Sequence, residues 1–122
     1  MKTLLSVVSV VVLLAGCSSP ANREVRACEE FFSSPASVLD EVGNNIAIVV
    51  GLGDEFSGTS IGRALGEYGR SLQTWADHTY RNYRAPDWKD DDAFYYNMSL
   101  YKIAIDQHKE IISRCDDLLT SR

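Results

Sequence analysis

The sequence lacks the motifs that mark most small enzymes and cofactor-binding proteins. It contains no Gly-x-Ser-x-Gly nucleophile elbow, no Cys-x-x-Cys-His haem signature and no EF-hand spacing of acidic residues. No glutamate lies three residues before His78 or His108, so the Glu-x-x-His motif of metal-binding bundles is missing. We therefore expect a non-enzymatic protein with no catalytic residues, no metal ligands and no cofactor.

Basic residues and long apolar runs are also few. The chain has 12 Lys and Arg against 17 Asp and Glu, a net charge of -5, which argues against a nucleic-acid-binding protein. It has no cluster of basic residues that could bind anionic lipid. After the first 16 residues, the longest apolar run is 46–52, whereas a membrane-spanning helix needs roughly 20 apolar residues.

The first 17 residues have the features of a targeting segment. Lys2 supplies a positive charge, and residues 4–14 are apolar except for two serines. The sequence Leu14-Ala15-Gly16-Cys17 then resembles the lipobox of bacterial type II signal peptides. This resemblance implies that residues 1–16 are a signal peptide that is removed, and that the thiol of Cys17 carries a diacylglyceryl group.

The lipid determines the predicted location and domain organisation. Two or more acyl chains anchor a protein stably to a membrane. We expect an extracytoplasmic lipoprotein, in the outer membrane of a Gram-negative cell, which Ser18 would suit, or in the plasma membrane of a Gram-positive cell. Residues 17–22 would form a short tether, and residues 23–122 a single helical domain.

Two cysteines remain once Cys17 is lipidated. Cys28 and Cys115 form an even pair in an oxidising compartment, which favours a disulfide. An intrachain bond is the preferred interpretation. The alternatives are two free buried thiols or a bond between chains.

Apolar residues recur at helical spacing and no stretch alternates as a strand does, so we expect an all-α domain. Helices are predicted over 23–32, from Pro35 (with Ser34 as N-cap) to about Val50, over 59–84, and from Phe94 onwards, with an acidic loop over 51–58. The inward-facing residues are predicted to be Val25, Cys28, Phe31 and Phe32; Val38, Leu39, Val42, Ile46 and Val49; Ile61, Leu65, Tyr68, Leu72, Trp75 and Thr79; and Phe94, Met98, Tyr101, Ile105, His108, Ile112, Cys115 and Leu119.

The predicted disulfide limits the topology. If residues 23–50 formed one kinked helix, Cys28 and Cys115 would lie at opposite ends of a rod of about 40 Å. A disulfide needs Cα atoms within about 7 Å of each other. A chain reversal at residues 33–35 instead gives four alternating helices and brings the cysteines together. We therefore predict an up-down four-helix bundle with a short first helix.

Histidines and glycines on the predicted helices have structural interpretations. His108 is expected to be a core histidine paired with a polar neighbour, and His78 lies beside the stripe of the third helix. Gly58, Gly62 and Gly66 repeat every four residues. In a water-soluble bundle this repeat favours a close approach of the second helix.

Aromatic and cationic residues gather around the connection between the third and fourth helices. Tyr, Trp and Arg dominate the energetics of protein interfaces, and not all of these side chains can face one core. Either they form a protein-binding surface, or they stack on each other and cap the end of the bundle. The candidates are Tyr80, Arg81, Tyr83, Arg84, Trp88, Tyr95 and Tyr96.

Three functional hypotheses follow. The first is a lipid-anchored, non-enzymatic module that binds another protein of the cell envelope through the Tyr80 to Tyr96 end. The second is a phage- or prophage-type superinfection exclusion or immunity lipoprotein, because a short tether would suit blocking a membrane-proximal entry apparatus. The third is a small envelope enzyme, which would need a cleft lined by carboxyl groups of raised pKa.

Overall fold

The computed structural model describes residues 20–38, 45–82 and 92–121, and the regular structure within these ranges is entirely helical. It comprises α2 (Pro20–Ser33), the single 3-10 turn η1 (Pro35–Ser37), α3 (Ile46–Glu55), α4 (Ser60–Asn82) and α5 (Asp92–Thr120). The all-α prediction is confirmed. Helix α2 begins at Pro20, three residues before the predicted start of the helical domain.

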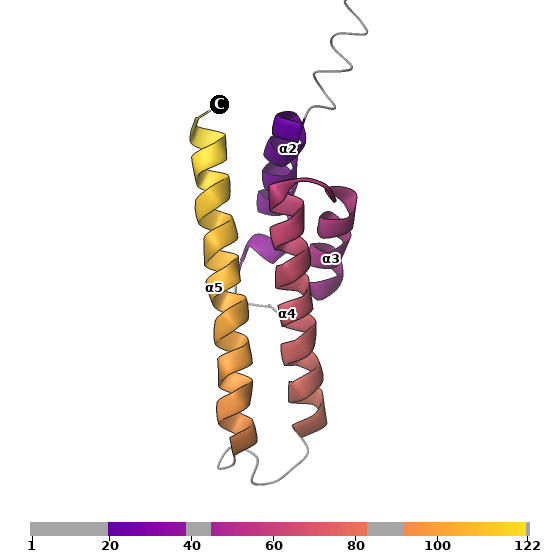
Figure 1. Cartoon of the computed structure of the whole chain (residues 1–122), viewed down its shortest axis with the longest axis vertical. Coiled ribbons are helices and arrows are strands. Elements are labelled where there is room, and N and C mark those ends of the chain that lie inside the picture. The colour runs from indigo at the N-terminus through magenta and orange to yellow at the C-terminus, as the bar shows by residue number, and fades with distance from the viewer. Residues whose placement is uncertain (1–19, 39–44, 83–91, 122) are drawn as a thin grey trace, which may run out of the picture.

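The two long helices α4 and α5 form the frame of the molecule (Figure 1). They pack side by side and run in opposite directions. Helices α2 and α3 lie along the half of this frame that contains the start of α4 and the end of α5. Among the described residues, the other half of the frame therefore consists of α4 and α5 alone.

The core lies where all four helices meet. Helix α4 buries the first four residues of its predicted stripe, Ile61, Leu65, Tyr68 and Leu72, and residues of α2, α3 and α5 face them. The last two, Trp75 and Thr79, are only half-buried. Burial, with a smaller contribution from the nearby Tyr101, raises the pKa of the Tyr68 hydroxyl to about 12. The buried side chains at this junction are Ala27, Cys28, Phe31, Val49, Leu52, Ile61, Leu65, Tyr68, Leu72, Ala104, Ile111 and Cys115.

The Cys28–Cys115 disulfide is present, as predicted. It joins α2 to α5 across a sequence separation of 87 residues, with 5.3 Å between the two Cα atoms. Both cysteines are fully buried in the core. The bond therefore ties α2 covalently to the C-terminal helix inside the core.

The predicted second helix is wrong at both ends. Pro35 starts only the 3-10 turn η1, after which Val38 is extended and 56% exposed rather than inward-facing. The helix proper begins at Ile46 and continues to Glu55, through most of the predicted acidic loop. The predicted core residues Leu39 and Val42 lie outside the described residues.

Packing against α4 explains why α3 continues through its glycines. Leu52 and Gly53 are buried, and a Cβ atom on Gly53 would lie 2.9 Å from the backbone nitrogen of Gly66. The predicted close approach of the second helix to the glycines of α4 is thus confirmed, although Gly53 provides the contact. Gly51 differs, because a Cβ there would meet no atom within 4 Å. A glycine inside a helix costs about 1 kcal/mol relative to alanine, and no contact in the described chain explains this one.

Met98 is a second correction to the predicted core. It continues the apolar spacing of α5, yet its side chain is 50% exposed. The spacing predicts a buried residue only where another helix covers that face. In the described structure α2 and α3 end before they reach this part of α5 (Figure 1).

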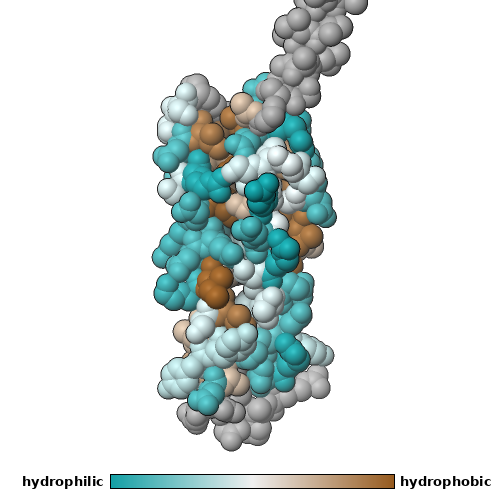
Figure 2. Space-filling model, in the orientation of Figure 1, coloured by the Kyte–Doolittle hydropathy of each residue, from teal (hydrophilic) through white to brown (hydrophobic). Residues whose placement is uncertain are grey.

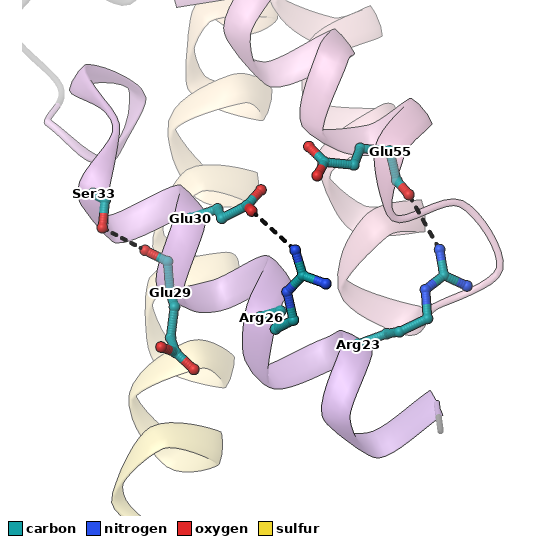
Figure 3. A network of polar contacts seen from close by, with 6 residues as sticks. All are labelled: Arg23, Arg26, Glu29, Glu30, Ser33 and Glu55. Carbon is teal, nitrogen blue, oxygen red and sulfur yellow. Dashed lines mark hydrogen bonds and ion pairs between the residues drawn. The ribbon is translucent and has the colours of Figure 1, made fainter. Parts of the chain in front are cut away.

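Two adjacent charged residues of α2 bind the turn between α3 and α4. The Arg23 guanidinium donates from Nη2 to the backbone oxygen of Glu55 (3.1 Å), at the C-terminal end of α3 (Figure 3). The same Nη2 also donates to the backbone oxygen of Ser57 (3.2 Å). Glu24 Oε1 accepts from the backbone N–H groups of Ser60 and Ile61, which open α4. A cation at a helix C-terminus and a carboxylate at a helix N-terminus both oppose the helix dipole favourably. Helix α2 therefore caps two other helices at once.

Candidate protein-binding surface

Three of the predicted candidates are exposed at the free end of the α4–α5 pair. Tyr80 is 72% exposed, Tyr95 68% and Tyr96 56%. They lie in the last turns of α4 and the first turns of α5, together with the exposed Arg81. We call these four residues the aromatic end. The other three predicted candidates, Tyr83, Arg84 and Trp88, lie outside the described residues, as does Cys17.

Ring contacts hold the tyrosines of α5 in place without burying them. Tyr96 packs edge-on against His78, with 5.0 Å between ring centroids, and Tyr95 packs against Phe94 at 5.8 Å. Arg81 donates from Nε to the backbone oxygen of Asp77 (3.3 Å), one turn earlier in α4. The rings of Tyr95 and Tyr96 therefore stack on neighbouring rings and are exposed to solvent at the same time.

A buried asparagine beneath the aromatic end was missed by sequence reasoning. Asn97 is only 5% exposed, and its amide makes three hydrogen bonds to α4. Its Oδ1 accepts from Trp75 Nε1 (3.2 Å), and its Nδ2 donates to Thr79 Oγ1 (2.7 Å) and His78 Nδ1 (3.1 Å). A buried amide with all these partners satisfied fixes the register of two helices, because sliding either helix would leave polar atoms unpaired. The tyrosines are thus displayed on a rigid support.

His108 occupies the core position that was predicted for it. It is 3% exposed, its Nε2 lies 3.1 Å from the backbone oxygen of Ala36, and its ring packs edge-on against Phe31 and Tyr68. Burial lowers the pKa of the imidazole, and the backbone hydrogen bonds to Ala36 and Ser37 oppose that shift only in part. The ring is therefore neutral in the folded protein at pH 7.

The free energy of unfolding should fall as the pH drops below about 6.5, the ordinary pKa of histidine. In that range the unfolded chain binds a proton at His108 that the folded chain does not, so acid favours unfolding. His108→Gln should flatten this dependence. Urea unfolding of both chains between pH 7 and pH 5 measures it, and His78 is common to both, so the difference reports His108. Identical slopes in the two chains would show that His108 does not titrate differently on folding.

A shallow groove lies between α4 and α5 on the half of the frame that α2 and α3 cover. It has a volume of about 270 Å³. One of its acids, Asp106, has a pKa held below its usual range, chiefly by the hydrogen bond from Lys102. A general acid of a glycosidase needs the opposite shift. The lining residues are Ala64, Glu67, Asp106, Gln107, Glu110, Ile111 and Arg114.

The described residues contain no group of three or more His, Cys, Asp or Glu side chains placed to hold a metal ion. None of the described helices combines the length and the apolarity that a membrane span requires. Comparison with protein-family models, with curated proteins and with solved structures found no match for this chain.

Proposed function

We propose that this protein is a small, non-enzymatic binding module, held at the outer face of a bacterial membrane by lipid on Cys17, that contacts another envelope protein through the aromatic end. The observation that supports binding is the exposure of Tyr80, Tyr95 and Tyr96 on a rigid two-helix support. Tyrosine offers a large contact area at little cost in side-chain entropy, and tyrosine and arginine are enriched among interface hot spots.

We also propose that the four helices alternate in direction as an up-down bundle. Two observations support this arrangement: α2 begins beside the end of α5, and α4 and α5 run in opposite directions (Figure 1). With this topology the lipid and the aromatic end lie at opposite ends of the molecule. Helix α4 has 23 residues, so the aromatic end would stand about 35 Å further from the membrane than the start of α4.

A photo-crosslinking amino acid at Tyr80 or Tyr95, in cells that express the full chain, tests the proposal. Both positions should give the same dominant adduct with one envelope protein. The matched control is a crosslinker at Lys109, which is also exposed on α5 but lies on the half of the frame that α2 and α3 cover. Lys109 should give little of that adduct.

The identity of the adduct separates the hypotheses. A resident envelope protein supports the binding module, whereas a phage component or a channel used for phage entry supports superinfection exclusion. No adduct from either tyrosine, in a chain that is folded and anchored, would contradict a binding role for the aromatic end.

A further inference from the structure

The polar side chains beneath the aromatic end fix the protonation state of His78. We call Trp75, His78, Thr79 and Asn97 the polar cluster. Trp75 Nε1 carries a hydrogen and can only donate, so the atom of Asn97 that lies 3.2 Å from it must be the carbonyl oxygen Oδ1. The amide nitrogen Nδ2 therefore points to Thr79 Oγ1 (2.7 Å) and to His78 Nδ1 (3.1 Å). Since an amide nitrogen only donates, His78 Nδ1 must accept with its lone pair, so the ring is neutral with its proton on Nε2.

A proton on His78 Nδ1 is incompatible with this arrangement. It would set two N–H donors against each other across 3.1 Å, and the hydrogen bond between Asn97 and His78 would be lost. Turning the Asn97 amide over would restore that bond, but it would place Nδ2 opposite the N–H of Trp75. Flipping the imidazole would place a carbon atom, which cannot accept, opposite Asn97. Each rearrangement therefore leaves at least one donor of the polar cluster without its acceptor.

In the described structure the His78 ring faces α5 through Asn97 and Tyr96, and Tyr96 is the titratable residue of these two. The charged side chains of the described residues in the neighbouring turns of both helices are Asp77, Arg81 and Asp92. The Asp77 carboxylate accepts a hydrogen bond from Gln73 Nε2 (2.8 Å), one turn earlier in α4. The hydrogen bond from Asn97 is therefore the contact that distinguishes the neutral ring from the protonated one.

His78 also supports one of the exposed tyrosines. Its ring is half-buried, and the ring of Tyr96 packs edge-on against it with 5.0 Å between the centroids. On the visible face of the molecule most of the surface is hydrophilic, and brown apolar surface shows in separate patches (Figure 2). A binding surface made of a few aromatic rings depends on how those rings are held. A His78 ring that leaves its position therefore removes a support of Tyr96.

We propose that His78 makes the aromatic end sensitive to acid: when Nδ1 takes a proton from solvent, the polar cluster rearranges, Tyr96 loses its support and the partner binds more weakly. The effect on binding rests on the proposed function, whereas the change within the polar cluster needs no partner. Histidine is the side chain whose charge ordinarily changes between about pH 5 and pH 8. The loss of one neutral hydrogen bond corresponds to a loss of about fivefold in affinity.

NMR of the full-length mature chain in detergent micelles tests the polar cluster without a partner. With isotope-labelled histidine, His78 at pH 7 should carry its proton on Nε2 and none on Nδ1. Between pH 7 and pH 5, the indole N–H signal of Trp75 and the ring signals of Tyr96 should shift with the same midpoint as the His78 signals. Titration of His78 that leaves both of these residues unchanged would overturn the proposal, as would an imidazole that stays neutral throughout this range.

The adduct from a photo-crosslinking amino acid at Tyr95 tests the consequence for binding. In cells that express the full chain, its yield should be about fivefold lower at pH 5 than at pH 7. His78→Gln keeps a neutral acceptor for Asn97 Nδ2 and should bring the ratio of the two yields close to one. His108→Gln is the matched control, because it replaces the other of the two histidines, which is buried in the core, and should keep the ratio.

Two failures of this test have different meanings. If acid reduces the yield equally in His78→Gln and in the unchanged chain, or in neither of them, His78 does not control the surface and the proposal is wrong. If the unchanged chain gives no adduct at pH 7, the proposed function is wrong instead. The NMR titration would then still decide whether protonation of His78 rearranges the polar cluster.

Discussion

Reducing the Cys28–Cys115 disulfide is expected to lower the free energy of unfolding by about 4–5 kcal/mol, because the bond closes a long loop in the unfolded chain. Small domains are stable by only about 5–15 kcal/mol, so the reduced protein should be close to unfolding at 37 °C. Urea titrations followed by circular dichroism, with and without reductant, measure the change. In thermal melts the midpoint should drop by roughly 20 °C.

A double variant separates the bond from the packing of its sulfur atoms. Cys28→Ala with Cys115→Ala removes both buried sulfurs, so it should be somewhat less stable than the reduced protein. Reductant should have no effect on that variant, which controls for effects of the reagent. Equal urea midpoints for oxidised and reduced protein would mean that the unfolded chain gains little freedom when the loop opens.

Gly62→Ala should destabilise the protein by about 3 kcal/mol, because a Cβ atom has no room there. It would lie 2.6 Å from the carbonyl carbon of Phe56, closer still to the carbonyl oxygen, and 2.9 Å from Thr59 Oγ1. Thr59 is 3% exposed and cannot move freely, because its hydroxyl donates to Phe56 O (2.7 Å) and accepts from the Gly62 N–H (2.9 Å). Thermal and urea unfolding of the variant measure the loss.

Gly66→Ala is the matched control for this substitution. It makes the same change one turn further along α4, where an added Cβ would meet no atom within 4 Å. It should raise the free energy of unfolding by up to about 1 kcal/mol, because alanine favours the helix over glycine. The two variants should therefore shift stability in opposite directions. A loss of stability in both would indicate that helix flexibility, rather than the crowded turn, explains the glycines.

The sequence predicted the long helices α4 and α5 more accurately than the elements before them in the chain. In α4 the regular spacing from Ile61 to Leu72 identified the buried stripe, because one helix face is covered along that length. The disulfide was predicted from the even pair Cys28 and Cys115, together with the oxidising compartment that the resemblance of residues 14–17 to a lipobox implies. Helix α3 was misplaced because local signals favour a break at its glycines, whereas contact with α4 stabilises the helix through them.

The sequence predicted which tyrosines form the candidate surface, but not the buried Asn97 that supports them. The exposure of Tyr80, Tyr95 and Tyr96 follows from there being more aromatic rings than one core can hold. Asn97 was missed because a polar residue beside an apolar stripe usually faces solvent. Its burial is favourable because α4 presents three polar partners to it, Trp75, His78 and Thr79. Pairing between helices is not visible in the sequence of either helix alone.

The position of the disulfide also determines how the molecule would carry mechanical load. A pull on the N-terminus enters α2, whose covalent link to α5 lies at Cys28, before the later turns of α2. Ahead of Cys28, α2 is joined to α3 and α4 through the hydrogen bonds of Arg23 and Glu24. Helix α5 is continuous over 29 residues, about 43 Å, and it runs from Cys115 back to Tyr95 and Tyr96. Tension between the start of α2 and a partner bound at Tyr95 and Tyr96 would therefore have a direct path through one disulfide and one helix.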